Sequence, residues 1–244
     1  MRKVGTDARK EKIEKEKASL KLMSEGASKK TRKRLDRIGE CGIWISMMPH
    51  KLHGTLLTRD EFSDNIRLRY SLRPLALCSH CDGCGEGFSI EHALSCKKGG
   101  LVTQRHDDAR DEAGNLAAQA LTKGRVSYEP LINYGRDTSA AMPCVAATTG
   151  NQAGEEARGD VLVHGLWDKS FGCVLDTRVT DPDARSYAQL FSSQVLKAAE
   201  KVKKDKYLDP CLARRRGFMP LVYSVDGTAG KEAKSFGASP HFLR

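Results

Sequence analysis

The chain has 244 residues, of which 41 are Lys or Arg and 31 are Asp or Glu, so its formal charge is +10. No apolar run approaches the ~18 residues of a transmembrane helix, and no charged and then apolar leader opens the sequence. These features argue against a membrane protein and a secreted protein, and they predict a soluble intracellular one.

Most of the positive charge lies in the first 37 residues. Residues 1–37 hold 14 Lys or Arg against 6 Asp or Glu, a local charge of +8. The charges over 9–21 alternate in sign at helical spacing, which predicts a basic helical arm over 1–37. This arm is either a solvated surface helix or a contact for nucleic acid. A cluster of five cations also fits a nuclear-import signal and predicts a nuclear location. Its members are Lys29, Lys30, Arg32, Lys33 and Arg34.

Residues 38–77 are predicted to form a helical linker. An apolar stretch runs up to Leu57, and a short helix is expected over 60–70. Thr58 and Glu61 have the spacing of a capping box, in which each side chain bonds the backbone N–H of the other residue.

The segment 78–100 is rich in Cys and Gly and carries the most specific pattern of the chain. Cys81, Cys84, His92 and Cys96 follow the spacing Cys-x2-Cys-x7-His-x3-Cys. Thiolates and imidazoles at this spacing are typical ligands of tetrahedral zinc, and four protein ligands leave no open position. The pattern therefore predicts a zinc knuckle with a structural zinc ion.

Ser89 is expected to cap a short helix that presents His92 and Cys96 on one face. Cys78 and His80 lie close enough in the sequence to be substitute ligands. The alternative is a group of buried thiols beside an unrelated histidine.

Helix and strand patterns alternate after residue 100. The expected elements are a helix over 103–123, a strand over 125–132, a long loop over 135–158, strands over 160–166 and 172–180, a helix over 184–207 and a strand over 218–225. This order predicts an α/β or α+β fold with a mixed sheet flanked by helices.

The two strands around Asp168 are predicted to form a hairpin with a pair of facing carboxylates. If the turn centres near Asp168, the numbers of paired residues sum to about 336, and Asp160 falls opposite Asp176. Like charges in this position destabilise a hairpin unless a cation lies between them. The pair therefore predicts a site for Mg²⁺ or Mn²⁺ that supports phosphodiester hydrolysis. The alternative is a solvent-exposed hairpin end with scattered charges.

Basic side chains accompany this pair. Arg178 projects from the same face of its strand as Asp176. Lys203 and Lys206 lie three residues apart on the next expected helix, and either of them would orient a water molecule or neutralise charge on a phosphate.

Five segments form a recognisable combination: Cys81-Asp-Gly-Cys-Gly, Glu91-His-Ala-Leu-Ser-Cys-Lys-Lys-Gly-Gly-Leu-Val, Arg105-His-Asp-Asp-Ala-Arg, Leu175-Asp-Thr-Arg-Val-Thr-Asp-Pro-Asp-Ala and Lys203-Lys-Asp-Lys-Tyr-Leu. Together they resemble the C-terminal region of non-LTR retrotransposon polyproteins, over residues 35–230. Such elements encode a reverse transcriptase, a cysteine–histidine zinc knuckle and a restriction-like endonuclease.

The resemblance implies a PD-(D/E)xK nuclease fold over residues 101–230. Asp160 and Asp176 match its two metal-binding acids, with Lys203 or Lys206 as the catalytic lysine on the following helix. Gly159 stands where the motif has Pro, and Arg178 stands where the parent motif has Lys. Arg cannot release a proton as Lys can.

Arg105, His106 and Asp107 match the Arg-His-Asp segment of the family. The resemblance implies that Arg105, His106 and Arg178 contact the substrate, although His106 also fits catalytic support or a packed core histidine. No Tyr-x-Asp-Asp motif of a reverse transcriptase occurs. We therefore expect a truncated copy of the C-terminal end of an element, with residues 231–244 as its tail.

The leading hypothesis is a metal-dependent endonuclease that nicks DNA at a retrotransposon insertion site, with DNA and possibly the element RNA as partners and no membrane contact. The alternative is a catalytically inactive remnant that binds nucleic acid through its knuckle and arm. A third hypothesis, a zinc-stabilised protein-interaction module, predicts no salt dependence of binding.

Overall fold

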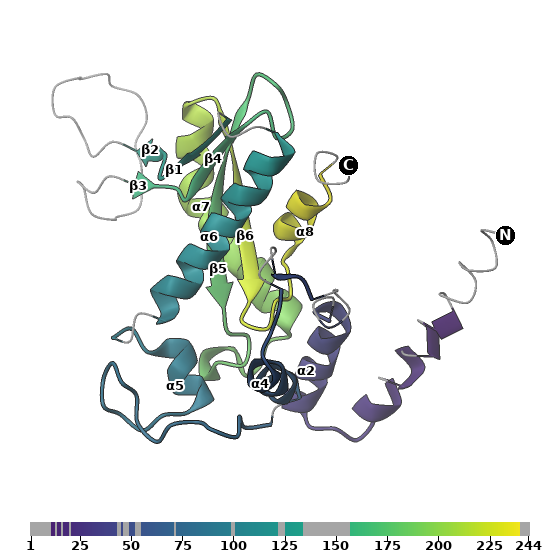
Figure 1. Ribbon diagram of the computed structural model, residues 1–244. Helices are drawn as coiled ribbons and strands as arrows, with labels where there is room; N and C mark the ends of the chain where they lie inside the picture. Colours follow the sequence, from purple (N-terminus) through teal and green to yellow (C-terminus); the bar gives the residue numbers. More distant parts are fainter. Residues whose placement is uncertain are drawn as a thin grey trace. The chain divides into compact units, whose positions relative to one another are not determined.

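The computed structural model describes residues 11–12, 14–15, 17–19, 21–42, 45, 49–51, 55–70, 72–98, 101–121, 125–133 and 157–239. The chain forms two compact units (Figure 1). Unit 1 consists of residues 1–101, 181–195 and 224–228, and unit 2 of residues 102–180, 196–223 and 229–244. Within the described ranges, no helix has both the length and the apolar character that crossing a bilayer requires.

Unit 1 is built from short helices. They are α2 (Lys29–Glu40), α4 (Arg59–Arg69), α5 (Ile90–Ser95) and the 3₁₀ turn η3 (Arg185–Tyr187). Ser28 caps α2 by accepting a hydrogen bond from the backbone N–H of Thr31. Thr58 and Glu61 form the predicted capping box at the start of α4, with both reciprocal hydrogen bonds present. The capping box that the sequence predicts is therefore confirmed.

The described residues between 11 and 19 are helical and exposed. Lys15 pairs with Glu11 at 2.8 Å and Lys17 with Glu14 at 3.2 Å, both along the helix surface. Such exposed pairs contribute little to stability. In this part of the arm, the charges lie on a solvated helix.

Arg37 is a buried cation of unit 1, with a side chain that is only 2% exposed. Its guanidinium forms ion pairs with Asp183 and Asp226, each with an N–O distance of 2.5 Å, and donates a hydrogen bond to Ser192. Burial opposes its charge, but the hydrogen bonds to the two carboxylates outweigh burial and raise the pKa of Arg37. The network joins α2 to two segments that follow much later in the chain.

Three residues of the suggested import signal also bond within unit 1. The buried Lys33 donates to the carbonyl oxygens of Pro182 and Tyr187, and Lys29 donates to Gln189. Arg34 donates to two carbonyl oxygens at the end of α4. Three of the five cations are therefore bonded within unit 1, and the cluster does not present a free run of five cations.

Unit 2 contains a four-stranded mixed sheet in the order β1-β4-β5-β6. Its strands are β1 (Val126–Tyr128), β4 (Val161–His164), β5 (Gly172–Thr180) and β6 (Arg216–Ser224), and a separate pair is formed by β2 (Leu131–Asn133) and β3 (Ala157–Arg158). β1 pairs with β4 and β4 with β5 in antiparallel fashion, whereas β5 and β6 run in the same direction (Figure 1). The predicted mixed sheet is confirmed.

Helices cover both faces of this sheet. They are α6 (Leu101–Ala120), α7 (Ser192–Ala213) and α8 (Lys231–Gly237). Alternating strand residues divide the core in two. One cluster joins β4, β5 and β6 to α6 and α8, and its members include Ala113, Ala117, Val161, Val163, Leu175, Leu221 and Phe236. The other lies on the α7 side and includes Ile132, Leu162, Val174, Cys211 and Phe218.

The hairpin register is the one that the sequence predicts. Val161 pairs with Leu175, and His164 pairs with Gly172, so each pair sums to 336. The expected strand over 125–132 is instead two strands, β1 and β2. Glu129 has a positive φ of 50° and precedes Pro130, which has no N–H to donate, so the chain turns between them.

Two helices differ from the sequence prediction. The helix expected over 184–207 begins only at Ser192, after the turn η3, and continues to Ala213 with Pro210 inside it. The tail expected after residue 230 contains α8, which buries Ala233 and Phe236 in the core. Most of the expected loop over 135–158 and of the apolar stretch over 43–57 lies outside the described residues.

Candidate functional site

The four predicted zinc ligands come together in unit 1. The Sγ atoms of Cys81 and Cys96 lie 3.9 Å apart, and Cys84 Sγ lies 3.2 Å from Nε2 of His92. All four ligand atoms lie within 4.8 Å of one another. Bonds of about 2.3 Å to sulfur and 2.0 Å to nitrogen place tetrahedral ligand atoms roughly 3.5 Å apart. This Cys3His cluster can hold a zinc ion.

A tight hairpin presents the first two thiols. The N–H of Cys81 donates to Glu86 O, and the N–H of Gly85 donates to Cys81 O, both at 2.8 Å. Gly85 has a φ of +76°, a conformation that favours glycine. Backbone N–H groups of Gly83 and Cys84 point at the Cys81 thiol and lower its pKa to about 6, which favours the thiolate that binds metal.

Helix α5 supplies the other two ligands. Ser89 caps it by accepting from the N–H of His92, and Cys96 follows its last residue. Of the two substitute ligands, Cys78 is exposed and His80 hydrogen-bonds Ser79 at 3.0 Å. Neither belongs to the cluster, so the structure favours Cys81 as the first ligand.

The two carboxylates of the hairpin lie next to each other in the sheet of unit 2. The N–H of Asp160 donates to Leu175 O, which extends the β4–β5 pairing to Asp160. Its Oδ2 accepts the N–H of Thr177 at 2.5 Å. Asp176 is 4% exposed. It lies two positions after Val174 on β5, so it projects from the same face of the sheet as Val174, whose side chain packs on the α7 side.

Two basic side chains from different helices reach these carboxylates. Lys203 of α7 places its Nζ 2.6 Å from Asp176 Oδ2. His106 of α6 places Nε2 3.4 Å from Asp160 Oδ1. The site therefore gathers β4, β5, α6 and α7, which lie far apart in the sequence.

Other predicted site residues take different positions. The Lys206 ammonium lies 4.7 Å from the centre of the Tyr207 ring. Arg178 donates from Nε to Thr180 Oγ1 at 3.2 Å. Arg105 is half-buried on α6. Of the two candidate lysines, Lys203 is the one whose ammonium contacts Asp176. The hydrogen bond from the Thr177 backbone to Asp160 had no signal in the sequence, because every residue except Pro carries an N–H.

The surroundings shift the pKa values of Asp160 and Asp176 in opposite directions. Burial opposes ionisation of Asp160, but the hydrogen bonds from His106 and Thr177 outweigh it and hold its pKa below the ordinary value. For Asp176, burial exceeds the effect of Lys203, and its pKa is raised. The hydrogen bond to Asp160 raises the pKa of His106. Opposed shifts in adjacent acids are typical of functional sites.

These shifts predict opposite effects of neutralisation on stability. Asp160, with a lowered pKa, stabilises the fold above its unfolded pKa, so Asp160→Asn is expected to lower the unfolding temperature at pH 7. Asp176 has a raised pKa, so its ionisation destabilises the fold increasingly as the pH rises above the unfolded pKa, and Asp176→Asn is expected to raise the unfolding temperature at pH 7. Thermal unfolding without added Mg²⁺ or Mn²⁺ measures both effects. The Asp176 effect should shrink as the pH falls through its raised pKa toward 4, whereas the Asp160 effect should persist there and shrink only at lower pH, as the pH falls through its lowered pKa. Shifts of the same sign in the two variants would contradict this prediction.

The donor set at the carboxylates suits a hard cation. Among the described residues, the only group of three or more metal-binding side chains is the Cys3His cluster. An ion at Asp160 and Asp176 would therefore keep several waters or take phosphate oxygens. Mg²⁺ binds in this way, commonly through one or two carboxylates.

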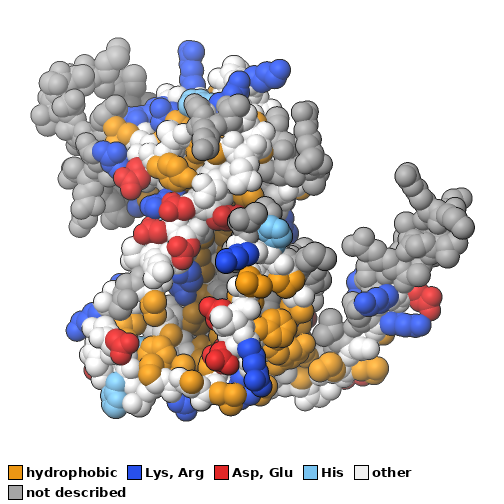
Figure 2. Space-filling view, viewed as in Figure 1, with side chains coloured by type: hydrophobic (Ala, Val, Ile, Leu, Met, Phe, Trp, Pro, Cys, Tyr) orange, Lys and Arg blue, Asp and Glu red, His pale blue; other side chains and the backbone are white. Residues whose placement is uncertain are grey.

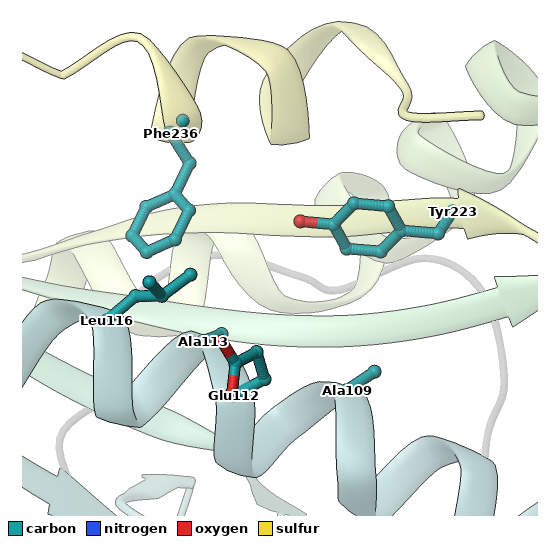
Figure 3. A pocket seen from close by; sticks show the side chains of 7 residues that line it. Ala109, Glu112, Ala113, Leu116, Tyr223 and Phe236 are labelled. Atoms are coloured by element: carbon teal, nitrogen blue, oxygen red, sulfur yellow. The ribbon is translucent and has the colours of Figure 1, made fainter. Parts of the chain in front are cut away.

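A separate apolar pocket of about 440 Å³ lies on the other side of the sheet. It is lined by Ala109, Glu112, Ala113, Leu116, Tyr223, Phe236 and Gly237 (Figure 3). These residues come from α6, β6 and α8, and the charged residues of the carboxylate site are not among them.

Comparison of the sequence with models of known protein families gives no match, and comparison with curated protein sequences gives none either.

Proposed function

We propose that the chain is a metal-dependent DNA endonuclease that nicks DNA at the insertion site of a non-LTR retrotransposon. The observation that supports this function best is the convergence of Asp160, Asp176 and Lys203. The hairpin register places the acids side by side, and Lys203 contacts Asp176 at 2.6 Å. The mixed sheet with acids on a central hairpin is consistent with a PD-(D/E)xK nuclease.

In this proposal, Asp160 and Asp176 hold Mg²⁺ or Mn²⁺. When bound, the cation activates water and neutralises charge on the phosphate. Lys203 favours the ionised form of the buried Asp176 and donates to the attacking water or to the phosphate. His106 and the Thr177 N–H hold the Asp160 carboxylate in one orientation.

The substitution at Arg178 is compatible with this assignment. Its guanidinium cannot give up a proton, and it bonds Thr180. Lys203 occupies the space beside Asp176 from α7 instead. We therefore assign the role of the catalytic lysine to Lys203.

The zinc cluster and the basic arm have a supporting role in the proposal. Zinc in a closed Cys3His site is structural. Lys and Arg contacts to phosphate position DNA, or the element RNA, without reading its sequence.

The test is nicking of supercoiled plasmid by the purified full chain with Mg²⁺ or Mn²⁺. We expect metal-dependent nicking by the wild type, and none by Asp176→Ala. Asp205→Ala is the matched control, because it removes an exposed carboxylate of α7 that pairs only distantly, at 3.8 Å, with Lys201. Absence of nicking in a chain that holds zinc and binds DNA in a salt-sensitive way would contradict the proposal and favour an inactive nucleic-acid-binding remnant.

A further inference from the structure

The tip of the β4–β5 hairpin exposes two aromatic side chains. Trp167 is 53% exposed and Phe171 is 39% exposed, although both belong to a short turn of unit 2. Between them lie Asp168, Lys169 and a serine. Neither the metal cluster nor the carboxylate site uses these residues.

The tip is held in a defined conformation by its own contacts. Leu166 is 1% exposed and anchors the turn in the core. The side-chain carboxylate of Asp168 accepts a hydrogen bond from the N–H of Ser170, and its backbone carbonyl oxygen accepts one from the N–H of Phe171. Gly165 has a φ of +83° and donates to Phe171 O. Because the backbone is fixed, the exposed rings lose little freedom when a ligand binds them.

Basic side chains surround this end of the sheet. Arg125 packs so closely on the hairpin that a Cβ at Gly165 would lie 2.5 Å from its Nη1. Lys169 and Arg215 are exposed. A Cβ at Gly217 would lie 3.4 Å from Cys173 Sγ, so β6 and the preceding Arg215 begin beside the start of β5.

Figure 2 shows Lys and Arg side chains projecting from the same end of unit 2. The one carboxylate of the turn, Asp168, is engaged by Ser170 through its backbone N–H and its hydroxyl. The tip thus combines exposed aromatic rings with three cations, Arg125, Lys169 and Arg215, against the one carboxylate of Asp168.

We propose that this hairpin tip is a second DNA contact, in which Trp167 stacks on an unpaired base while Arg125 and Lys169 bind the neighbouring phosphates. Exposed aromatic rings beside cations are the usual platform for single-stranded nucleic acid. DNA as the ligand rests on the proposed nuclease function, since the same hairpin carries the acids at its other end.

The hairpin sets the reach of this contact. Trp167 follows Asp160 by seven positions, of which β4 covers residues 161–164. Because a strand rises about 3.3 Å per residue, the two residues lie at most roughly 23 Å apart. A DNA strand that follows the hairpin, at ~3.4 Å per nucleotide, therefore passes at most about seven nucleotides between the cut and the stacked base. The tip would hold a strand opened on one side of the nick.

Binding of fluorescein-labelled single-stranded DNA, without added Mg²⁺ or Mn²⁺, tests the proposal. Trp167→Ala is expected to weaken binding about tenfold, within the range for loss of one stacked base. Phe62→Ala removes a similarly exposed ring from α4 and is expected to leave affinity unchanged. In a Trp44→Phe chain, where Trp167 is the remaining tryptophan, DNA should quench the tryptophan fluorescence.

Wild-type affinity in Trp167→Ala, together with unquenched Trp167 fluorescence, would overturn the proposal. A tenfold preference for RNA of the same sequence would overturn the assignment to DNA. The plasmid assay separates this proposal from the nuclease. If the wild type cuts plasmid but Trp167→Ala binds DNA normally, only the stacking contact is contradicted. If the wild type does not cut plasmid but Trp167→Ala loses affinity for DNA, the stacking contact is supported and the nuclease function is contradicted.

Discussion

Replacing Cys84 by serine is expected to reduce the zinc content of the purified protein from one ion per chain to none. A hydroxyl is a much poorer zinc ligand than a thiolate, and only three cluster ligands would remain. Because a zinc ion in this cluster would hold the Cys81 hairpin to α5, its loss should also unfold this part of unit 1. Elemental analysis measures the zinc, and the charge-transfer bands of the cobalt-substituted protein report the thiolates.

Cys78→Ser is the matched control for this variant. Cys78 lies three residues before Cys81 but is exposed and lies outside the cluster. We expect it to keep one zinc ion and the full cobalt spectrum. Zinc retained by Cys84→Ser, or lost from Cys78→Ser, would show that the ligand set is assigned incorrectly.

Replacing Lys203 by methionine is expected to reduce the rate of plasmid nicking by about 10² to 10³, the usual cost of losing one donor to a developing charge. The variant keeps the aliphatic stem of the side chain but removes the cation that lies 2.6 Å from Asp176. Without that cation, burial should raise the pKa of Asp176 further and weaken its hold on a metal ion.

Lys206→Met provides the comparison, since it changes the same residue type three positions along the same helix. The Lys206 ammonium lies over the Tyr207 ring. Its loss should change the nicking rate by only a few fold. Initial rates at saturating Mn²⁺, with circular dichroism to check the fold, distinguish the two variants. A larger loss in Lys206→Met than in Lys203→Met would reverse the assignment of the lysine.

Local patterns in the sequence predict the parts of the two sites that lie within one hairpin or one short helix. The polar turn at Asp168 fixes which residues of β4 and β5 face each other, so the register follows from the turn position. The spacing of Cys81, Cys84, His92 and Cys96 predicts their cluster for the same reason, since a tight turn and a capped helix suffice to present them.

Contacts between distant segments could not be predicted in this way. Helical spacing allows either Lys203 or Lys206 to face the hairpin, and the packing of α7 on the sheet decides between them. Helix α7 also continues beyond Pro210 to Ala213, although Pro removes one backbone hydrogen bond from a helix, and the same packing on the sheet stabilises it there.

Helix α8 is a further element that the sequence could not predict, because the hydrogen-bond partner at its N-terminus comes from another part of the chain. Gly230 at its N-cap has no side chain to accept a hydrogen bond. Glu200 of α7 accepts the N–H of Glu232, and Lys204 pairs with the Glu232 side chain. Only the folded chain brings these residues together.

The ion pairs of Arg37 determine where this protein can be divided for expression. A fragment that ends near residue 101 contains the arm and the knuckle as continuous sequence, but it lacks Asp183 and Asp226. Arg37 would then lose both carboxylate partners and Ser192, and α2 would lose the network that joins it to residues 181–195 and 224–228. Unit 1 is thus discontinuous in the gene, and a soluble version needs either the full chain or a permuted one that carries residues 181–195 and 224–228.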